Sequence, residues 1–239
     1  MKLIRFAVDG RVRDGAIEGE DARAGSDRWP LAHVKLLAPC LPTKIIGVGR
    51  NYADHAAEMG NPLPKEPLLF LKAPSALNET GGDIVYPRQS RRVDYEGELA
   101  VVIGKRCRDV SRADALGVVL GYTICNDVTA RDLQETDGQW ARAKGFDTFA
   151  PLGPCIVTGL DPAALRVETR LNGELKQDCP TTKLIFDIPA LIEYISAAFT
   201  LEPGDVIATG TPSGVGSMQR GDEVSVTIEG IGTLTNRVR

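Results

Sequence analysis

Hydrophobic and polar residues alternate with a period of two along much of this chain, which is typical of half-buried β-strands. The segment KLIRFAVDGRVRDGAIEG alternates in this way and breaks at Asp9-Gly10 and at Asp14-Gly15, which predicts short hairpins. The segment LLAPCLP follows, and its two prolines predict a boundary. We therefore expect a small β-rich N-terminal domain over residues 1–42 and a second domain over residues 43–239.

Short apolar segments continue beyond this boundary. TKIIGVG and LLFLKAP predict buried strands, and a further strand is expected from Val93 to Ile103. An Asn172-Gly173 pair between two alternating segments predicts another hairpin. Because strands dominate and do not alternate regularly with helices, the pattern favours a strand-rich α+β fold over a doubly wound parallel sheet.

Two segments have helical character. RNYADHAAEMG contains helix-forming alanine and glutamate and ends at Gly60. In DIPALIEYISAAF, Asp187 can cap the first turn, and apolar residues recur on one face. These apolar residues are Leu191, Ile192, Ile195 and Phe199. By contrast, residues 128–154 have little continuous apolar pattern and predict a long loop, which in a compact domain is usually functional.

The composition is that of an ordinary globular protein. The net charge of the 239 residues is −4, with acidic and basic residues interspersed, which argues against a nucleic-acid-binding surface. No apolar run approaches the roughly 18 residues that span a bilayer, and the first residues lack the apolar segment of a signal peptide. The five cysteines form no CxxC pair, which favours free thiols in a reducing compartment. We therefore expect a cytosolic protein.

Two acidic residues, Glu96 and Glu98, lie near the start of the most apolar predicted strand. Side chains alternate along a strand, so both carboxylates project from one face, with their Cα atoms roughly 7 Å apart. Two carboxylates at this spacing can converge on one cation, whereas unpaired carboxylates beside a buried strand would repel each other. Asp127 ends another apolar strand, in GYTICND, at a similar junction with a polar segment.

These three acids have two interpretations. Hard oxygen donors without a nearby histidine suit Mg²⁺, Mn²⁺ or Ca²⁺ better than zinc, and the chain has only two histidines. Bound Mg²⁺ usually keeps several waters, which a substrate can displace. In the other interpretation, the acids form salt bridges at a sheet rim with Arg91, Arg92 or Lys105. The spacing alone leaves both interpretations open.

A second pair, His55 and Glu58, shares a face if the segment around it is helical. A carboxylate orients an imidazole and raises its basicity, which is the arrangement that general bases use. An ordinary surface pair is the alternative. The loop TGTPSGVG can cradle a carboxylate or be a plain turn. No complete GxGxxG, Walker or GxSxG motif is present, so the residues do not support dinucleotide binding or acyl-enzyme chemistry.

Taken together, these motifs resemble the fumarylacetoacetate hydrolase superfamily. The similarity is greatest to its short members of the acylpyruvase, oxaloacetate decarboxylase and hydroxyheptadienedioate isomerase type. It rests on seven segments that occur in the family's order, from about Thr43 to Val238. These segments are GVGRNYADHAAEMG, EPLLFLKAPSAL, VDYEGELAVVIGK, GYTICNDVTARDLQ, AKGFDTFAPLGP, LNGELKQ and LEPGDVIATGTPSGVG.

The resemblance implies roles for individual residues. The family's three carboxylate ligands for Mg²⁺ or Mn²⁺ correspond to Glu96, Glu98 and Asp127. The resemblance further implies that His55 and Glu58 form a catalytic dyad on a lid helix, and that Lys144 is the active-site lysine. Residues that contact the substrate in the family correspond to Gln134, Thr211 and, in a matching segment, Lys72.

The family's fold is a mixed, strand-rich β-roll or sandwich, here with residues 43–239 as the catalytic domain after the small N-terminal one. The resemblance implies a homodimer that acts on a small 2-oxo or 2,4-dioxo acid, as in the catabolism of aromatic compounds. It implies neither a membrane nor a nucleic-acid partner.

The main expectation for activity is cleavage of a carbon–carbon bond in acylpyruvate- or fumarylpyruvate-type 2,4-dioxo acids. In this reaction His55 and Glu58 would activate water, and a metal-bound pyruvate enolate would leave. Oxaloacetate decarboxylation, keto–enol tautomerisation and 2-hydroxyhepta-2,4-diene-1,7-dioate isomerisation are alternatives, because a stabilised enolate serves each of them. A metal-stabilised binding protein without turnover is the non-enzymatic alternative.

Overall fold

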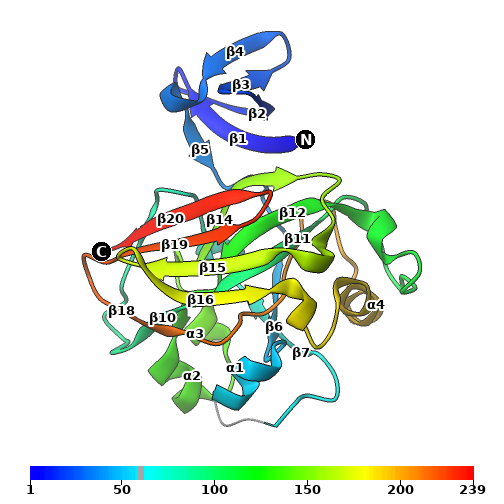
Figure 1. Ribbon diagram of the computed structural model, residues 1–239, viewed down its shortest axis with the longest axis vertical. Helices are drawn as coiled ribbons and strands as arrows, with labels where there is room; N and C mark the ends of the chain where they lie inside the picture. Colours follow the sequence, from blue (N-terminus) through cyan, green and yellow to red (C-terminus); the bar gives the residue numbers. More distant parts are fainter. Residues whose placement is uncertain (59–61) are drawn as a thin grey trace.

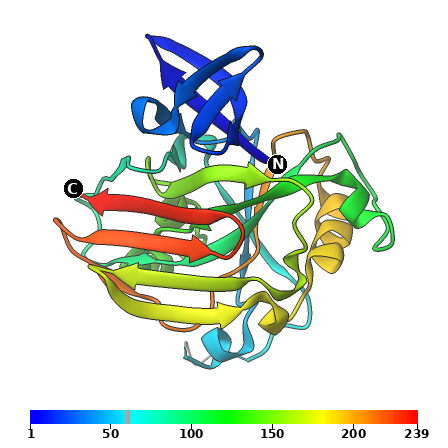
Figure 2. The ribbon, with the colours of Figure 1, turned by 45° about the horizontal axis from the view of Figure 1, so that its top comes forward.

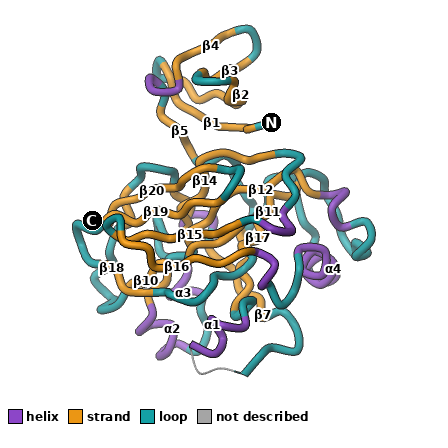
Figure 3. Tube along the Cα trace, viewed as in Figure 1, coloured by secondary structure: helices purple, strands orange, loops and turns teal. Residues whose placement is uncertain are grey.

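The computed structural model describes residues 1–58 and 62–239, apart from the side chains of residues 55–57. Strands dominate it, and its helices are short (Figures 1 and 3). The largest sheet contains β1 (Lys2–Val8), β2 (Arg11–Glu18), β3 (Asp21–Ala24), β4 (Asp27–Pro30), β5 (Lys35–Leu37), β6 (Ile45–Gly49), β7 (Leu68–Lys72), β8 (Leu77–Asn78), β11 (Gly97–Ile103), β12 (Val119–Asn126), β14 (Ala150–Val157) and β17 (Val206–Ala208). Its order is β4-β3-β2-β1-β14-β12-β11-β17-β6-β7, with β5 beside β1 and β8 beside β14.

A second sheet packs against β11, β12 and β14 of the first. It has the order β16-β15-β19-β20-β9 and contains β9 (Asp83–Ile84), β15 (Arg166–Leu171), β16 (Glu174–Pro180), β19 (Glu223–Ile228) and β20 (Gly232–Val238). Figure 2 shows β16, β15, β19 and β20 side by side. A small third sheet, β13-β10-β18, contains β10 (Val93–Tyr95), β13 (Thr129–Ala130) and β18 (Gly216–Met218).

The helices are α1 (Ala53–Glu58), α2 (Arg131–Asp137), α3 (Ala141–Gly145) and α4 (Ile188–Ala198). Short 3₁₀ helices cover Leu31–His33, Pro74–Ala76, Ala115–Val118, Pro162–Ala164 and Thr181–Lys183. In Figure 3, α1, α2 and α3 lie together at the end of the molecule opposite the N-terminal strands. The strand-rich α+β class predicted from the sequence is confirmed.

The helix predicted from the apolar spacing after Asp187 is α4. Asp187 caps it, because its Oδ1 accepts a hydrogen bond of 3.0 Å from the backbone N–H of Ala190. The apolar face is buried through Leu191, Ile192 and Ile195. The hairpin at Asn172-Gly173 is likewise present between β15 and β16, with both turn residues in the left-handed region that such hairpins need.

The N-terminal strands form a lobe on the main sheet (Figures 1 and 2). The predicted turn at Asp14-Gly15 is wrong, since β2 runs through both residues. Gly15 instead allows close packing: a Cβ there would lie 2.0 Å from the carbonyl oxygen of Arg23. The lobe is joined to the main sheet because Lys2 of β1 pairs with Val157 of β14. The division into domains at residue 42 stays a prediction.

The predicted strand from Val93 to Ile103 is two strands. β10 and β11 belong to different sheets, and Glu96 lies between them. The strand β11 is buried on both faces, with Leu99 in one apolar cluster and Ala100 in the other. Both faces of this strand therefore contribute to the core.

The predicted long loop over residues 128–154 contains β13, α2 and α3 before β14 begins. The inward residues of the two helices include charged ones, Arg131 and Lys144, each at most 3% exposed. An apolar helical pattern is therefore missing from the segment, although both helices are anchored in the interior. Within the described ranges, no helix combines the length and apolar character needed to cross a membrane.

Asp205 links the start of β17 to the start of β6. Its buried carboxylate accepts hydrogen bonds from the backbone N–H groups of Lys44 at 3.1 Å and Glu202 at 2.7 Å, and from the Thr43 hydroxyl at 2.7 Å. It also forms an ion pair with the Lys44 ammonium. Burial alone would raise the pKa of Asp205, but these hydrogen bonds outweigh it and lower the pKa.

We expect Asp205→Asn to lower the free energy of unfolding at pH 7 by roughly 1–3 kcal/mol, because charge-assisted hydrogen bonds are lost from a buried site. A lowered folded-state pKa means that the carboxylate stabilises the fold above its unfolded pKa of about 3.9 and loses this effect as the pH falls further. Urea unfolding at pH 7 and below pH ~4 should show the difference between wild type and variant narrowing in acid.

The matched control is Asp14→Asn, which alters a carboxylate that is 83% exposed. It should change the unfolding free energy by less than about 0.5 kcal/mol. A difference between wild type and Asp205→Asn that stays constant as the pH falls would contradict the assignment.

Candidate metal centre and active site

The pairing of β11 with β12 brings three acids together. Gly97 lies opposite Asn126, so Glu96 and Asp127 continue from the two strands at the same end. The backbone N–H of Asp127 donates to the carbonyl of Glu96 at 2.8 Å, and the N–H of Glu96 donates to Oδ1 of Asn126 at 3.0 Å. These contacts fix the break between β10 and β11.

One carboxylate oxygen from each of Glu96, Glu98 and Asp127 lies within 4.8 Å of the other two. The three residues are only 4%, 2% and 1% exposed. Buried carboxylates this close together repel one another strongly unless positive charge lies between or beside them. The convergence expected from the sequence is therefore present.

Lys144 and Lys72 supply part of that positive charge. The Lys144 ammonium contacts Oε2 of Glu96 at 2.8 Å and Oδ2 of Asp127 at 2.6 Å, and the Lys72 ammonium contacts Oδ1 of Asp127 at 2.6 Å. Burial disfavours the charged ammonium, but Asp127 and Glu96 outweigh this effect and raise the pKa of Lys144. Lys144 is therefore a cation in the site.

Arg131 of α2 holds the other side of Glu96. Its Nη2 contacts Oε1 of Glu96 at 2.5 Å, its Nε contacts Asp94 at 2.9 Å, and its Nη1 donates to Oε1 of Gln134 at 2.6 Å. Burial disfavours the charged guanidinium, but Glu96 and Asp94 outweigh it and raise the pKa of Arg131. Arg131 is not among the candidate residues predicted from the sequence, although it lies between Asp127 and Gln134 in the segment GYTICNDVTARDLQ.

The salt bridges expected in the alternative interpretation involve other partners. Arg92 pairs with Asp94 at 3.0 Å. The three acids line a cavity of about 290 Å³, and two of them, Glu96 and Asp127, contact cations from β7, α2 and α3. The acids are thus part of an interior charged network and not of a solvated sheet rim.

Glu98 has the least compensated carboxylate of the three. The backbone N–H of Gly210 donates to its Oε2 at 2.9 Å, and among the described residues no cationic side chain forms an ion pair with it. Burial, followed by the charges of Asp127 and Glu96, raises the pKa of Glu98 well above its ordinary value, although Lys144 lowers it partly. A divalent cation among the three carboxylates would remove this cost, and their oxygen donors suit Mg²⁺ or Mn²⁺.

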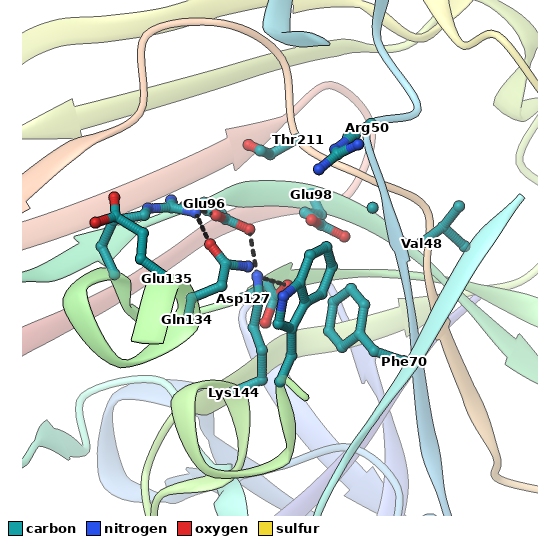
Figure 4. A pocket seen from close by; sticks show the side chains of 13 residues that line it. Val48, Arg50, Phe70, Glu96, Glu98, Asp127, Gln134, Glu135, Lys144 and Thr211 are labelled. Atoms are coloured by element: carbon teal, nitrogen blue, oxygen red, sulfur yellow. Dashed lines mark hydrogen bonds and ion pairs between the residues drawn. The ribbon is translucent and has the colours of Figure 1, made fainter. Parts of the chain in front are cut away.

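Figure 4 shows the cavity and the side chains around it. Its described lining residues include Arg50, Phe70, Gln134, Glu135 and Trp140, besides the three acids and Lys144. The rings of Phe70 and Trp140 pack edge to face with centroids 5.4 Å apart. The Lys144 ammonium lies 4.8 Å from the Phe70 ring centroid. Phe70 and Trp140 thus form an aromatic part of the cavity lining beside its charged side chains.

Thr211 also lines the cavity, but its hydroxyl is already bonded. It donates to the carbonyl of Gly97 at 3.0 Å and accepts from Nε2 of Gln177 at 2.7 Å. Gln177 also accepts from the N–H of Gly97 at 3.0 Å, so it connects the Thr211 loop to β11. Gln177 is not among the candidate residues predicted from the sequence, and its only signal there is its place in the segment LNGELKQ.

The other candidate residues predicted from the sequence are Lys72, Glu58 and His55. Lys72 contacts Asp127 and the carbonyl of Val128, and it is not among the described residues that line the cavity. Glu58 of α1 accepts from the N–H of Gly214 at 3.0 and 3.2 Å. The side chain of His55 lies outside the described part, so the His55–Glu58 dyad stays a prediction.

Comparison with known proteins identifies the family. The model of the fumarylacetoacetate (FAA) hydrolase C-terminal domain matches residues 44–239. The chain belongs to the fumarylacetoacetate hydrolase family. One relative in this family is oxaloacetate tautomerase YisK of Bacillus subtilis, which is 48% identical over 231 residues. The match covers 90% of this chain and 76% of YisK.

Two solved structures of the family are informative. The 5-carboxymethyl-2-hydroxymuconate delta-isomerase of Mycobacterium smegmatis has a TM-score of 0.95 at 51% identity, and the match covers 100% of this chain and 98% of that one. The maleylpyruvate hydrolase of Sphingobium sp. SYK-6, in complex with manganese(II) and pyruvate, has a TM-score of 0.84 at 35% identity and the same coverage. The chain therefore has the fold of this family and a buried acidic group suited to a divalent metal ion.

We expect Mn²⁺ to bind the wild-type protein and raise its melting temperature in a concentration-dependent way, because the ion binds only the folded arrangement of carboxylates. Glu98→Gln should weaken Mn²⁺ binding by at least about 100-fold, since it removes a charged ligand. Without metal, the same variant should melt at an equal or higher temperature, because it relieves repulsion from Asp127 and Glu96. Calorimetric titration and thermal unfolding measure the two effects.

The matched control is Glu135→Gln, because Glu135 is exposed and lines the same cavity outside the three acids. Its affinity for Mn²⁺ should stay within about threefold of wild type. Unchanged Mn²⁺ affinity in Glu98→Gln would contradict the assignment of Glu98 as a ligand.

Proposed function

We propose that this protein is a divalent-metal-dependent tautomerase that interconverts the keto and enol forms of a small 2-oxo acid of the oxaloacetate type. In this isomerisation a proton leaves the carbon beside the 2-oxo group and a proton is added to the 2-oxo oxygen, so the composition of the substrate does not change. The observation that supports the proposal most strongly is the buried group of Glu96, Glu98 and Asp127 at a small cavity.

The proposal assigns the metal ion to these three carboxylates. When bound there, Mg²⁺ or Mn²⁺ would act as a Lewis acid toward the 2-oxo oxygen and favour loss of the neighbouring proton. The cavity volume of about 290 Å³ is at the small end of ligand pockets, which suits an acid with a short carbon chain.

The chain's own residues have complementary roles in this proposal. The Lys144 ammonium lies against Glu96 and Asp127 at 2.8 and 2.6 Å, and there it would stabilise negative charge on the substrate. Arg131 occupies Oε1 of Gln134, which leaves the Nε2 hydrogens of that amide as donors toward the substrate. Phe70 and Trp140 limit the access of water and strengthen these electrostatic interactions.

Hydrolysis of acylpyruvates, the main expectation from the sequence, becomes the second candidate. YisK and the muconate isomerase are 48% and 51% identical to this chain, whereas the maleylpyruvate hydrolase is 35% identical. The position of Glu58 against Gly214 still favours a role for α1 beside the TGTPSGVG loop. Both reactions would use the same three carboxylates, so the metal site does not distinguish them. We rank the tautomerase above the hydrolase because of the higher sequence identity to the tautomerase and isomerase relatives.

The direct test follows the absorbance of freshly dissolved enol oxaloacetate with purified protein and Mg²⁺. We expect the wild type to accelerate the loss of enol well beyond the rate with Mg²⁺ alone, and chelation to abolish the acceleration. Glu98→Gln should reduce the activity by about 100-fold or more, since ion and substrate activation are lost together. Glu135→Gln should retain the wild-type rate within about threefold.

Parallel assays separate the candidates. Pyruvate release from oxaloacetate reports decarboxylation, and loss of acetylpyruvate reports hydrolysis. Metal-dependent turnover of acetylpyruvate without any acceleration of oxaloacetate tautomerisation would overturn the proposal in favour of the hydrolase.

We expect His55→Ala to impair any acetylpyruvate hydrolysis at least about tenfold more than tautomerisation, because only hydrolysis needs a base that activates water. The kcat values of both reactions for His55→Ala and wild type measure this. Equal losses in the two reactions would contradict a role for His55 that is specific to water activation.

A further inference from the structure

Arg50 is a cation of the cavity that takes no part in the network around the three acids. It lines the cavity directly after the end of β6. In Figure 4 its side chain lies on the side of Thr211 and Glu98, across the pocket from Gln134 and Glu135. Its guanidinium forms no hydrogen bond or ion pair with any residue in the described part of the chain.

The other cations of the cavity are already bonded. Three nitrogens of Arg131 contact Asp94, Glu96 and Gln134, and the Lys144 ammonium contacts Glu96 and Asp127. Both side chains are at most 3% exposed. Arg50 is therefore the cavity cation, among the described residues, whose planar set of N–H donors is open to a ligand.

The backbone fixes Arg50 in an unusual conformation. Its φ is 58°, in the left-handed region that residues other than glycine rarely adopt. The residue after it, Asn51, is fully buried and binds Phe186 through both its side-chain N–H and its Oδ1, at 3.0 and 2.8 Å. Its Nδ2 also donates to the carbonyl of Thr209 at 2.8 Å.

Asn51 therefore ties the turn at Arg50 to the strand that leads into the Thr211 loop. A strained residue persists only where its surroundings impose it, and such residues cluster at sites that bind ligands. The left-handed backbone conformation of Arg50 and its location in the cavity are separate observations, and both point to a ligand-binding role.

We propose that Arg50 binds the second, distal carboxylate of a 2-oxo dicarboxylic acid, and that it makes the site selective for dicarboxylates over monocarboxylates. The inference rests on the proposed function, because it assumes that the 2-oxo acid end of the substrate lies at the three acids. A guanidinium fork matches a carboxylate with two parallel hydrogen bonds, and an arginine without an internal partner has these donors available.

The charges of the cavity favour this role. Its acidic side chains, Glu96, Glu98, Asp127 and Glu135, would repel a carboxylate wherever a metal ion or a cationic side chain does not compensate their charge. Arg50 provides positive charge away from Lys144 and Arg131, whose charges already face these acids. A methyl group in place of the distal carboxylate would leave the Arg50 donors without a partner from the ligand.

The test compares oxaloacetate with 2-oxobutanoate, which has a methyl group in place of the distal carboxylate. Binding to the Mg²⁺-loaded protein is measured by calorimetry for the wild type, Arg50→Gln and Arg50→Lys. We expect Arg50→Gln to raise the Kd of oxaloacetate by about tenfold or more while the Kd of 2-oxobutanoate changes by less than about threefold. Arg50→Lys should recover part of the loss, since it keeps the charge without the fork.

Controls separate this effect from damage to the fold. Arg106→Gln, which changes an arginine that is 72% exposed and paired with Glu202, should leave both Kd values unchanged. The Mn²⁺ affinity and melting temperature of Arg50→Gln should equal those of the wild type. Equal weakening of both acids, or weakening of neither, would overturn the inference.

The binding assay also distinguishes the two proposals. If the wild type fails to accelerate tautomerisation but Arg50→Gln loses its preference for the dicarboxylate, the proposed function fails and the role of Arg50 stands. If tautomerisation is accelerated and Arg50→Gln keeps the wild-type ratio of Kd values, the function stands and the role of Arg50 fails. Where both hold, Arg50→Gln should raise the KM for oxaloacetate with little change in kcat.

Discussion

Three buried carboxylates within 4.8 Å of one another are the constraint on which the rest of the site depends. Such a group is unfavourable unless cations surround it, and the fold supplies them from three different elements: Lys72 from β7, Arg131 from α2 and Lys144 from α3. Even so, Glu98 keeps a raised pKa, because burial and its acidic neighbours outweigh the stabilising contacts. The site is thus preorganised for additional positive charge.

This constraint also explains the helices around the site. The segment between β12 and β14 folds inward through Arg131 and Lys144, and both side chains bind the acids at the end of β11 and β12. Ion pairs in the interior hold α2 and α3 where a surface helix would use an apolar stripe. The same segment brings Gln134 and Trp140 to the cavity, so the site is complete only when this segment is folded.

The relatives are named for different activities and include a tautomerase, an isomerase and a hydrolase. A metal-centred site can stabilise one type of charge, while the groups at the far side of the cavity decide which substrate is held and what is done to it. In this chain Arg50 lines the cavity, and Glu58 of α1 accepts a hydrogen bond from the N–H of Gly214.

Several elements of the fold and the family follow from local patterns in the amino-acid sequence. Short apolar segments predicted β6 and β7, and an Asn-Gly turn between alternating segments predicted the β15–β16 hairpin. A capping aspartate and apolar residues at helical spacing predicted α4, because short-range periodicity reflects which side of an element is buried. The order of seven motifs indicated the family, and residue type and spacing made Glu96, Glu98 and Asp127 candidates for binding a cation without excluding salt bridges.

The way in which these elements combine depends on contacts between residues far apart in the sequence. The break at Glu96 depends on Asn126 and Asp127 of a neighbouring strand, and the helices at residues 131–145 depend on ion pairs to acids far along the chain. The same holds for the turn at Asp14-Gly15, where close contact with Arg23 replaces a bend. Local patterns carry no information about such long-range contacts. These contacts determine the path of the backbone at these places, and they leave the N–H donors of the Arg50 side chain without a partner among the described residues.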